Sequence, residues 1–308
     1  MKKAFLFPGQ GAQFPGMGKD LWEKSKTVKD IFDTASKASG LDVTSLIFDG
    51  TAEDLKATDK SQTAITAVSM SASALLREKG IKAGGTAGFS LGEYAALAEC
   101  GVVSKDDVFP LIKARGDIME SVSRSADTPE GKSGMAAVIG LSLEQTETAI
   151  RDAEIANLYV ANYNSPSQVV VSGTAEALKE GQNVLKEAGA KRVIPLKVSG
   201  PFHCPLLEDA KKEFSEVLSR YDFSDPAIPF FSNVTGHSVN SGEEIKRLCA
   251  EQLVSTVRWV DVEESLVGAG FSDFLEVGPG KVLTGLLKAF SRDLTCKQAG
   301  TIEQIESL

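Results

Sequence analysis

The sequence predicts an α/β protein in which a mostly parallel β-sheet presents a set of loops along one edge. Five short loops each follow directly on an apolar, strand-like run: PGQG, GFSLG, SGPFHC, SNVTG and GPGK. Helical apolar spacing recurs between these runs, and strand–helix alternation is typical of parallel sheets. Because ligands bind at the carboxyl ends of parallel strands, we expect several of these loops to face one crevice.

The N-terminal third alternates between strand and helix patterns. Lys3–Phe7 is an apolar run that stops at the PGQG turn, as a strand does. Residues 19–38 and 61–79 have the apolar spacing of helices. Thr86–Phe89 then predicts a second, short strand of small residues, and an alanine-rich helix is expected directly after it.

A further helix is expected over residues 104–123. Ser104 is a suitable N-cap, and acidic residues follow in the first turn, where they favour the helix dipole. Pro110 should bend this helix or delay its start. A polar stretch containing proline and glycine, residues 124–134, then separates the helix from the next part of the chain.

A distinct pattern follows this linker. Its elements occur in the order β-α-β-β-α-β, the ferredoxin-like order, and they are strand 135–139, helix 142–152, strands 158–163 and 168–171, helix 175–188 and strand 192–198. We therefore expect a ferredoxin-like subdomain at residues 129–198, inserted into a core that is formed by residues 1–128 and 199–308.

The last third returns to alternating helix and strand. Pro205 suits the first turn of a helix that extends to about Tyr221. Strands are expected at residues 228–231, which end at SNVTGH, and at residues 273–277, which end at GPGK. A helix follows through Phe290, and it completes the predicted core.

The composition excludes several classes of protein. The chain has 308 residues, a net charge of −9, and 42% hydrophobic residues. This apolar content is that of a globular protein and is too high for a disordered one. The acidic balance disfavours nucleic-acid binding, which needs a basic surface. The longest apolar stretches are far shorter than the ~18 residues that a membrane span needs.

The cysteines and histidines limit the chemistry further. The four cysteines form no CxxC pair and no zinc-like cluster with histidine. A reducing, cytoplasmic compartment is the simplest interpretation. With only two histidines, a histidine-rich metal site is almost excluded, and we expect no metal. Any histidine-based catalysis must use His203 or His237.

The strongest indication of chemistry is the G-x-S-x-G sequence at residues 88–92, between a predicted strand and a predicted helix. The glycines permit the sharp turn that lifts the Ser90 hydroxyl out of the sheet. The following helix offers unpaired backbone N–H groups, so the Leu91 N–H is the natural donor to an oxyanion. The alternative is a serine that only caps the helix. The strand before it and the helix after it favour a nucleophile.

A serine nucleophile needs a base, because its hydroxyl is a weak nucleophile at neutral pH. His203 lies in SGPFHCP, between a predicted strand and a predicted helix, where a neutral imidazole could take the Ser90 proton. His237 is the competing candidate, but its flanking residues predict an exposed turn. The group that orients His203 is either an acid from elsewhere in the chain or a backbone carbonyl.

Gln10 is a candidate for the second oxyanion donor. It lies between the two glycines of PGQG, which allow the backbone to approach a ligand closely. The alternative is that these glycines only form a turn. A turn, however, needs no particular residue between them.

Arg115 lies in the middle of the apolar stripe of helix 104–123. A buried guanidinium is costly unless it is paired, and its planar donors fit a carboxylate. The partner is either an internal Asp or Glu or a carboxylate on the substrate. Together, Ser90, His203, Arg115 and Gln10 suggest acyl transfer from a substrate with a second, free carboxylate. They leave open whether the acceptor is water, an amine or a thiol.

The sequence closely resembles the malonyl-CoA:acyl carrier protein transacylases of fatty acid synthesis over nearly its whole length. The resemblance depends on the order and spacing of these motifs: FPGQGAQ, GFSLGEYAAL, ARGDIM, GMAAVIGL, NYNSPSQVVVSG, SGPFHCPLL, EQL followed by VRW, and LEVGPGKVLTGLL. It implies a hydrolase-like α/β core with an inserted ferredoxin-like subdomain.

The resemblance also implies roles for individual residues. Ser90 is expected to be the nucleophile that becomes a malonyl ester, and His203 its base, in a dyad without a carboxylate. The backbone carbonyl of Gln252 is expected to orient the imidazole. The N–H groups of Gln10 and Leu91 would form the oxyanion hole, and Arg115 would bind the malonyl carboxylate.

Three further residues match polar or selective positions of the family's pocket. Gln62 and Asn162 would line it, and Phe202 resembles the malonyl-selective form of the motif, in which its bulk crowds a methyl-branched acyl chain. The sequence departs from the family at Phe89, where many members have histidine. That departure should affect the packing beside Ser90 rather than abolish activity.

The activity implied is ping-pong transfer of a malonyl group from malonyl-CoA to the phosphopantetheine thiol of acyl carrier protein. Neither a metal nor a redox cofactor is implied, and no membrane or nucleic-acid partner; a monomer is expected. Three alternatives stay open: a serine hydrolase or thioesterase, a transacylase for another acyl group or for polyketide synthesis, and a non-catalytic module that binds the acyl carrier.

Overall fold

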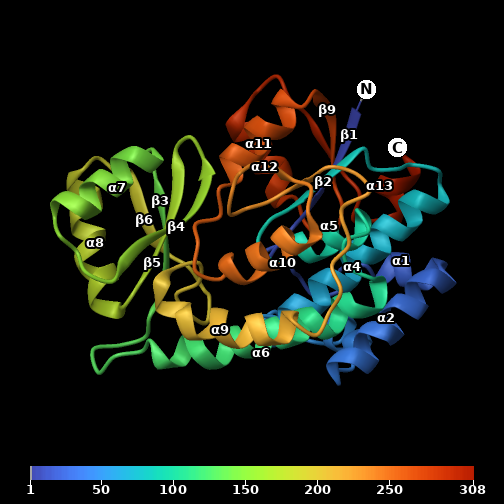
Figure 1. Ribbon diagram of the computed structural model, residues 1–308, viewed down its shortest axis with the longest axis horizontal. Coiled ribbons are helices and arrows are strands. Elements are labelled where there is room, and N and C mark those ends of the chain that lie inside the picture. Colours follow the sequence, from blue (N-terminus) through green and yellow to red (C-terminus); the bar gives the residue numbers. More distant parts are fainter. Residues whose placement is uncertain (1) are drawn as a thin grey trace.

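The computed structural model describes residues 2–308 and contains two β-sheets (Figure 1). Met1, the first residue of the predicted core, lies outside the described residues. The larger sheet has six strands in the order β10-β9-β1-β2-β7-β8, and all neighbours are parallel except the β7–β8 pair. Its strands are β1 (Lys2–Phe7), β2 (Gly85–Gly88), β7 (Phe230–Phe231), β8 (Ser238–Val239), β9 (Phe271–Glu276) and β10 (Cys296–Gln298).

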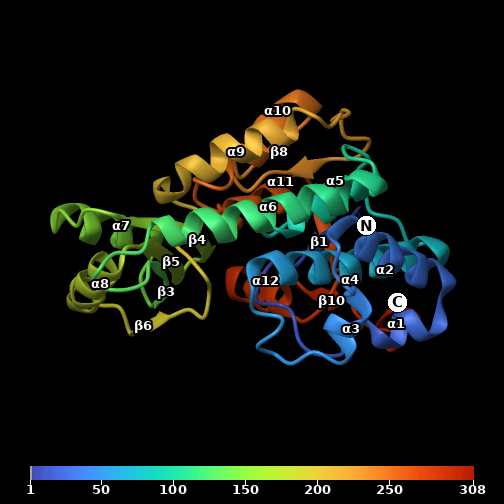
Figure 2. The same cartoon turned by 90° about the horizontal axis from the view of Figure 1, so that it is seen from below.

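Helices cover the larger sheet and form much of the main body (Figure 2). The two longest are α4 (Thr58–Glu78) and α6 (Lys105–Ser125), and α6 runs beside α9 (Glu208–Leu218) in both views. The others are α1 (Lys19–Lys24), α2 (Lys26–Ser39), α3 (Val43–Phe48), α5 (Gly92–Glu99), the short 3₁₀ helix at Pro205–Leu207, α10 (Gly242–Glu251), α11 (Trp259–Gly268), α12 (Val282–Phe290) and α13 (Ile302–Glu306).

The second sheet is antiparallel and lies with two helices at one end of the molecule (Figure 1). Its elements are β3 (Gly134–Ile139), α7 (Leu143–Asp152), β4 (Leu158–Ser165), β5 (Gln168–Gly173), α8 (Ala175–Glu187) and β6 (Arg192–Pro195). These elements follow one another in the β-α-β-β-α-β order that the sequence predicts, and the strands pair in the order β4-β5-β3-β6. A small apolar core between this sheet and its helices includes Val138, Leu158 and Leu185.

The predicted fold class, a mostly parallel core sheet with a ferredoxin-like unit, is confirmed, but several boundaries differ. The helix expected over residues 19–38 is two helices, because Ser25 leaves the helical region and caps α2 through its hydroxyl. Pro110 lies inside α6 and does not delay its start, which is at Lys105. The expected strand 192–198 ends at Pro195, and the strand expected at 228–231 contains only its last two residues.

The topology places four of the predicted loops side by side. Strands β9, β1, β2 and β7 are consecutive parallel neighbours, so GPGK, PGQG, GFSLG and SNVTG all emerge at the same edge of the sheet. No helix within residues 2–308 is long and apolar enough to cross a membrane.

Candidate active site

Ser90 lies on a sharp turn between β2 and α5, at the carboxyl edge of the larger sheet. Its φ of 49° lies in the left-handed region, which is unusual for a residue with a side chain. The glycines on either side allow the close approach. A Cβ on Gly88 would lie 2.0 Å from the Gly92 carbonyl carbon, and one on Gly92 would lie 2.0 Å from Phe7 O. The G-x-S-x-G sequence therefore forms the strained strand-to-helix turn that the sequence predicts.

His203 provides a basic nitrogen beside this serine. Its Nε2 atom lies 2.8 Å from Ser90 Oγ, and its Nδ1 atom lies 2.8 Å from the carbonyl oxygen of Gln252. A carbonyl oxygen can only accept, so Nδ1 carries the proton and Nε2 is free to accept the Ser90 proton. Gln252 is the C-cap of α10, and the last carbonyls of a helix have no partner within the helix. The orienting group is thus a backbone carbonyl and not an acid.

The environment of His203 favours the neutral imidazole. The side chain is buried, and burial together with the charge of Arg115 lowers its pKa from 6.5 to about 4, against the opposing effect of the Gln252 carbonyl. A neutral base is therefore available throughout the physiological range.

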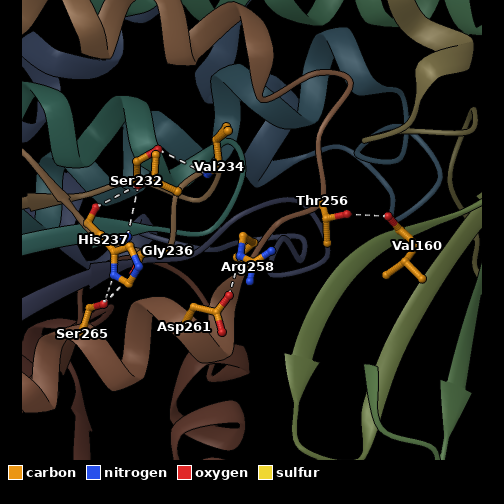
Figure 3. Close-up of polar contacts among 10 residues, drawn as sticks. Val160, Ser232, Val234, Gly236, His237, Thr256, Arg258, Asp261 and Ser265 are labelled. Atoms are coloured by element: carbon orange, nitrogen blue, oxygen red, sulfur yellow. Dashed lines mark hydrogen bonds and ion pairs between the residues drawn. The ribbon is translucent and has the colours of Figure 1, made fainter. Parts of the chain in front are cut away.

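His237 lies elsewhere, as its polar flanks predict. The residue is exposed, and its Nδ1 atom lies 2.8 Å from the Ser265 hydroxyl on α11 (Figure 3). The Ser265 hydroxyl in turn donates to the carbonyl of Gly236 at 2.7 Å. These contacts hold the SNVTGH loop against α11. Of the two histidines, only His203 reaches Ser90.

Arg115 is 1% exposed, and its guanidinium points at the Ser90 hydroxyl. Nη2 donates to Ser90 Oγ at 3.2 Å and to Gln252 Oε1 at 2.8 Å, and Nη1 donates to Gln62 Oε1 at 2.9 Å. The ring of Tyr94 lies 5.6 Å from the guanidinium carbon. Three hydrogen bonds use three of five N–H donors, so two remain, one of them on Nε, which has no partner among the described residues. No acidic side chain contacts Arg115 directly among those residues. Spare donors on a buried cation fit a carboxylate ligand.

The amides of Gln10 and Leu91 are unpaired. Within residues 2–308, neither N–H donates to a protein acceptor, although the N–H groups of Gly11, Ser90 and Gly92 do. Both residues line the same cavity as Ser90. Free N–H groups beside a nucleophile are the feature that stabilises an oxyanion.

A cavity of about 190 Å³ brings the site together between the two sheets. Seven predicted residues line it: Gln10, Ser90, Leu91, Arg115, Asn162, Phe202 and His203. The other two, Gln62 and Gln252, lie behind it and bind Arg115. Phe89 also lines the cavity and packs on Trp259, with ring centroids 5.4 Å apart, so the departure from histidine is accommodated by aromatic packing.

The smaller sheet is fixed to the core close to this cavity. Val257 pairs with strand β4 through two backbone hydrogen bonds of 2.9 Å, Val257 N to Ala161 O and Tyr163 N to Val257 O. The Thr256 hydroxyl adds a bond of 2.7 Å to the Val160 carbonyl (Figure 3). Asn162 on β4 is thereby held opposite the edge of the larger sheet.

Sequence reasoning missed two buried residues of the site, Glu93 and Asn233. Asn233 accepts the Ser90 N–H at 2.6 Å, and Glu93 accepts the Asn233 N–H at 2.6 Å. Burial raises the pKa of Glu93 to about 8, although Asn233, Gln252 and Arg115 act to lower it. Both residues lie in motifs that the sequence analysis identified, GFSLGEY and SNVTG. An acidic residue at a buried position of an alanine-rich helix was the signal that could have found Glu93.

The fold and this geometry define a class of protein. An α/β sheet that presents a strained serine, a histidine within hydrogen-bond distance and unpaired amides is the arrangement of serine-based acyl-transfer enzymes. Hydrolases and transferases share it, so the geometry alone does not separate them.

Comparison with known proteins narrows the class. The acyl transferase domain family matches residues 4–304. The malonyl CoA-acyl carrier protein transacylase of Bacillus subtilis (strain 168) is 40% identical over 309 residues, which cover 99% of this chain and 95% of that protein. The Escherichia coli (strain K12) protein of the same name is 37% identical over 294 residues, which cover 95% of this chain and 94% of that protein.

Comparison with solved structures points to the same family as the sequence relatives. The acyl carrier protein S-malonyltransferase of Vibrio cholerae superposes with a TM-score of 0.94 at 36% identity, covering 100% of this chain and 99% of that one. A malonyl-transacylase in complex with a type II PKS acyl-carrier protein has a TM-score of 0.94 at 35% identity. The superposition covers 100% of this chain and 98% of that one. The chain therefore belongs to the acyl transferase family and, within it, to the malonyl CoA-acyl carrier protein transacylases.

Proposed function

We propose that this chain transfers a malonyl group from malonyl-CoA to the phosphopantetheine thiol of an acyl carrier protein, through an ester on Ser90. One observation carries the proposal: the Ser90 hydroxyl lies within 2.8 Å of a neutral base, His203, and within 3.2 Å of a buried cation, Arg115. The first contact suits attack on an acyl carbon. The second selects an acyl group that carries a carboxylate.

In the first half-reaction, Ser90 Oγ attacks the thioester carbonyl of malonyl-CoA while His203 Nε2 takes its proton. The C–O bond forms and the carbonyl oxygen becomes an oxyanion, which the N–H groups of Gln10 and Leu91 bind. The C–S bond then breaks, and the imidazolium returns its proton to the departing CoA sulfur. The products are malonyl-Ser90 and free CoA, and the protein is otherwise unchanged.

The second half-reaction reverses these roles. His203 takes the proton of the carrier protein's thiol, and the sulfur attacks the ester of Ser90. The oxyanion forms in the same place, the C–O bond breaks, and Ser90 recovers its proton from His203. All nine proposed residues come from one chain, so the site needs no second copy.

Selectivity in this proposal comes from the acyl end of the cavity. Arg115 binds the malonyl carboxylate with its spare donors, and Gln62 holds the guanidinium from behind. Phe202 is buried and lines the cavity, and its main-chain carbonyl accepts the Ser172 hydroxyl at 2.6 Å, which anchors the backbone of this residue. Asn162 adds a polar group to the lining of the cavity.

Hydrolysis is the competing outcome, because the same dyad can activate water. The test is to mix the protein with malonyl-CoA, with and without holo acyl carrier protein, and to follow free malonate and malonyl-carrier protein. Transfer predicts one equivalent of CoA released without the carrier and rapid malonyl-carrier formation with it. Rapid, continuous release of malonate in the absence of the carrier would identify a hydrolase instead.

A further inference from the structure

A buried hydrogen-bond network connects the three side chains of the proposed chemistry. Its centre is Glu93, on the first turn of α5, which is 2% exposed. One carboxylate oxygen accepts the Asn233 N–H at 2.6 Å, and the other accepts the side-chain amide of Gln252. Both oxygens of Glu93 therefore face N–H donors.

Through Gln252, this carboxylate reaches Arg115 and His203. The Gln252 side-chain oxygen accepts from Arg115 Nη2 at 2.8 Å, and its nitrogen donates to Glu93 and to the Ser90 carbonyl at 3.1 Å. Arginine can only donate, and the Glu93 oxygen that meets Gln252 faces an N–H donor, so the amide fits in one orientation. Glu93, together with the Ser90 carbonyl, thus determines which end of the amide Arg115 meets. The carbonyl of the same residue orients His203.

Through Asn233, the carboxylate reaches the nucleophile turn. The Asn233 side chain accepts the Ser90 N–H at 2.6 Å and donates to the Gly88 carbonyl at 2.7 Å, so it spans both sides of the strained turn. Two contacts hold the loop that carries Asn233. One is the His237–Ser265 contact (Figure 3), and the other is the hydrogen bond of 2.9 Å from Arg258 N to the Asn233 carbonyl.

We infer that Glu93 is the positioning residue of this site. It acts through Gln252 and Asn233, and it fixes the relative positions of Arg115, His203 and Ser90. The inference rests on the proposed function. Glu93 touches none of the reacting atoms, and its effect on the reaction is to fix the donors and acceptors that do. Its clearest consequence is selectivity for a carboxylate-bearing acyl group, because Arg115 depends on the Gln252 amide.

The substitution Glu93→Gln tests this role with little change in size. It replaces one acceptor oxygen with an NH₂ donor, which then faces the NH₂ of Gln252. If Gln252 turns its amide to relieve this contact, it presents a donor to Arg115 and removes an acceptor from it. Arg115 then keeps only its contacts with Gln62 and Ser90 and is held less firmly.

The measurement is the rate of Ser90 acylation in single turnover, with malonyl-CoA and with acetyl-CoA as probes. Assays are run above pH 8, the pKa that burial gives Glu93, so that the wild-type carboxyl is ionised. We expect the malonyl-to-acetyl ratio of Glu93→Gln to fall by about tenfold or more. The matched control is Glu99→Gln, on the same helix, whose buried carboxylate contacts Ser73 and Arg77 instead. Its ratio should stay at the wild-type value.

A double variant tests the route through Gln252. Gln252→Ala removes the side-chain amide and keeps the carbonyl that orients His203. If Glu93 acts on Arg115 through that amide, adding Glu93→Gln to Gln252→Ala lowers the malonyl-to-acetyl ratio no further. Independent, multiplying losses would overturn the inference.

The outcomes separate the inference from the proposed function. A wild-type protein that never forms malonyl-Ser90 contradicts the function itself. If the wild type does form malonyl-Ser90, the positioning role is overturned by a folded Glu93→Gln protein whose malonyl-to-acetyl ratio equals that of the wild type. This includes the case in which its rates with malonyl-CoA and acetyl-CoA fall by the same factor. Should Glu93→Gln fail to fold, Glu93→Asp replaces it, because a carboxylate one methylene shorter cannot reach both Asn233 and Gln252. An unchanged ratio in Glu93→Asp would equally overturn the inference.

Discussion

Nδ1 of His203 lies 2.8 Å from the carbonyl oxygen of Gln252, and this contact fixes the tautomer of the imidazole. With the proton on Nδ1, the lone pair of Nε2 points at Ser90 Oγ. The contact replaces the carboxylate of a serine triad with a neutral acceptor. The orienting group therefore adds no negative charge that would hold the imidazole in its protonated form.

The pH dependence of acylation follows from this environment. Burial and Arg115 lower the pKa of His203 from 6.5 to about 4, so the neutral base persists as the pH falls through 6.5. We expect kcat/KM for malonyl-CoA to lose activity on the acid side near pH 4 rather than near pH 6.5. An acid limb close to 6.5 in the pH–rate profile of the free enzyme would contradict the buried, neutral assignment.

The same lowered pKa affects stability. Between pH 6.5 and about 4 the unfolded chain protonates this histidine while the folded protein does not. Its contribution to the free energy of unfolding is therefore complete above pH 6.5 and is lost as the pH falls toward 4. Denaturant unfolding of the wild type and of His203→Gln over this range measures it: the difference between the two should narrow as the pH is lowered.

Removal of Arg115 should abolish the preference for malonyl over acetyl groups. Arg115→Ala takes away a buried cation whose spare donors suit a carboxylate, so malonyl acylation of Ser90 should fall about a hundredfold or more. Acylation by acetyl-CoA should change far less. Arg124→Ala, on the same helix but in an exposed pair with Glu120, is the matched control and should keep the wild-type preference. Equal losses for both acyl groups would show that Arg115 is only structural.

Phe202 should exclude a methyl branch. The side chain is buried and lines the cavity with Ser90 and His203. Phe202→Ala frees space beside the acyl chain, so the rate with methylmalonyl-CoA relative to malonyl-CoA should rise by about tenfold. Competition between the two thioesters, read from the masses of the acylated protein, measures this ratio. A ratio that stays at the wild-type value would place the selective wall elsewhere.

The nucleophile turn should tolerate no side chain at Gly92. A Cβ there would lie 2.0 Å from Phe7 O on β1, so Gly92→Ala should lower the free energy of unfolding by about 1–3 kcal/mol through forced backbone shifts. Gly285→Ala is the control: it lies within α12, and a Cβ there meets no neighbouring atom within 4 Å. Thermal unfolding should show a lower Tm for Gly92→Ala and an equal or higher Tm for Gly285→Ala. Similar Tm values for the two variants would contradict the packing argument.

The sequence predicted the layers and picked out residues that the structure places together, because both leave local signals. The glycines around Ser90, the turn before His203 and the charge of Arg115 on an apolar stripe each stand out within a few residues. The β-α-β-β-α-β order could be predicted because each element has the apolar periodicity of its own secondary structure.

Elements that depend on tertiary contacts were predicted less well. Ser25 divides the first helical stretch, although the apolar spacing continues across it, and Pro110 remains within α6, where packing outweighs the missing hydrogen bond. Asn233 and Glu93 meet only because β2 and β7 are neighbours in the sheet, although they are 140 residues apart in the chain. No local pattern carries that pairing.

The central claim is that Ser90 carries the acyl group, and intact mass spectrometry tests it most directly. Wild type and Ser90→Ala are each incubated with malonyl-CoA and then with holo acyl carrier protein. We predict a single malonyl adduct on the wild type, which disappears as malonyl-carrier protein forms, and no adduct on Ser90→Ala. A wild type that forms no adduct, or a Ser90→Ala protein that forms one and passes it on, would contradict the account.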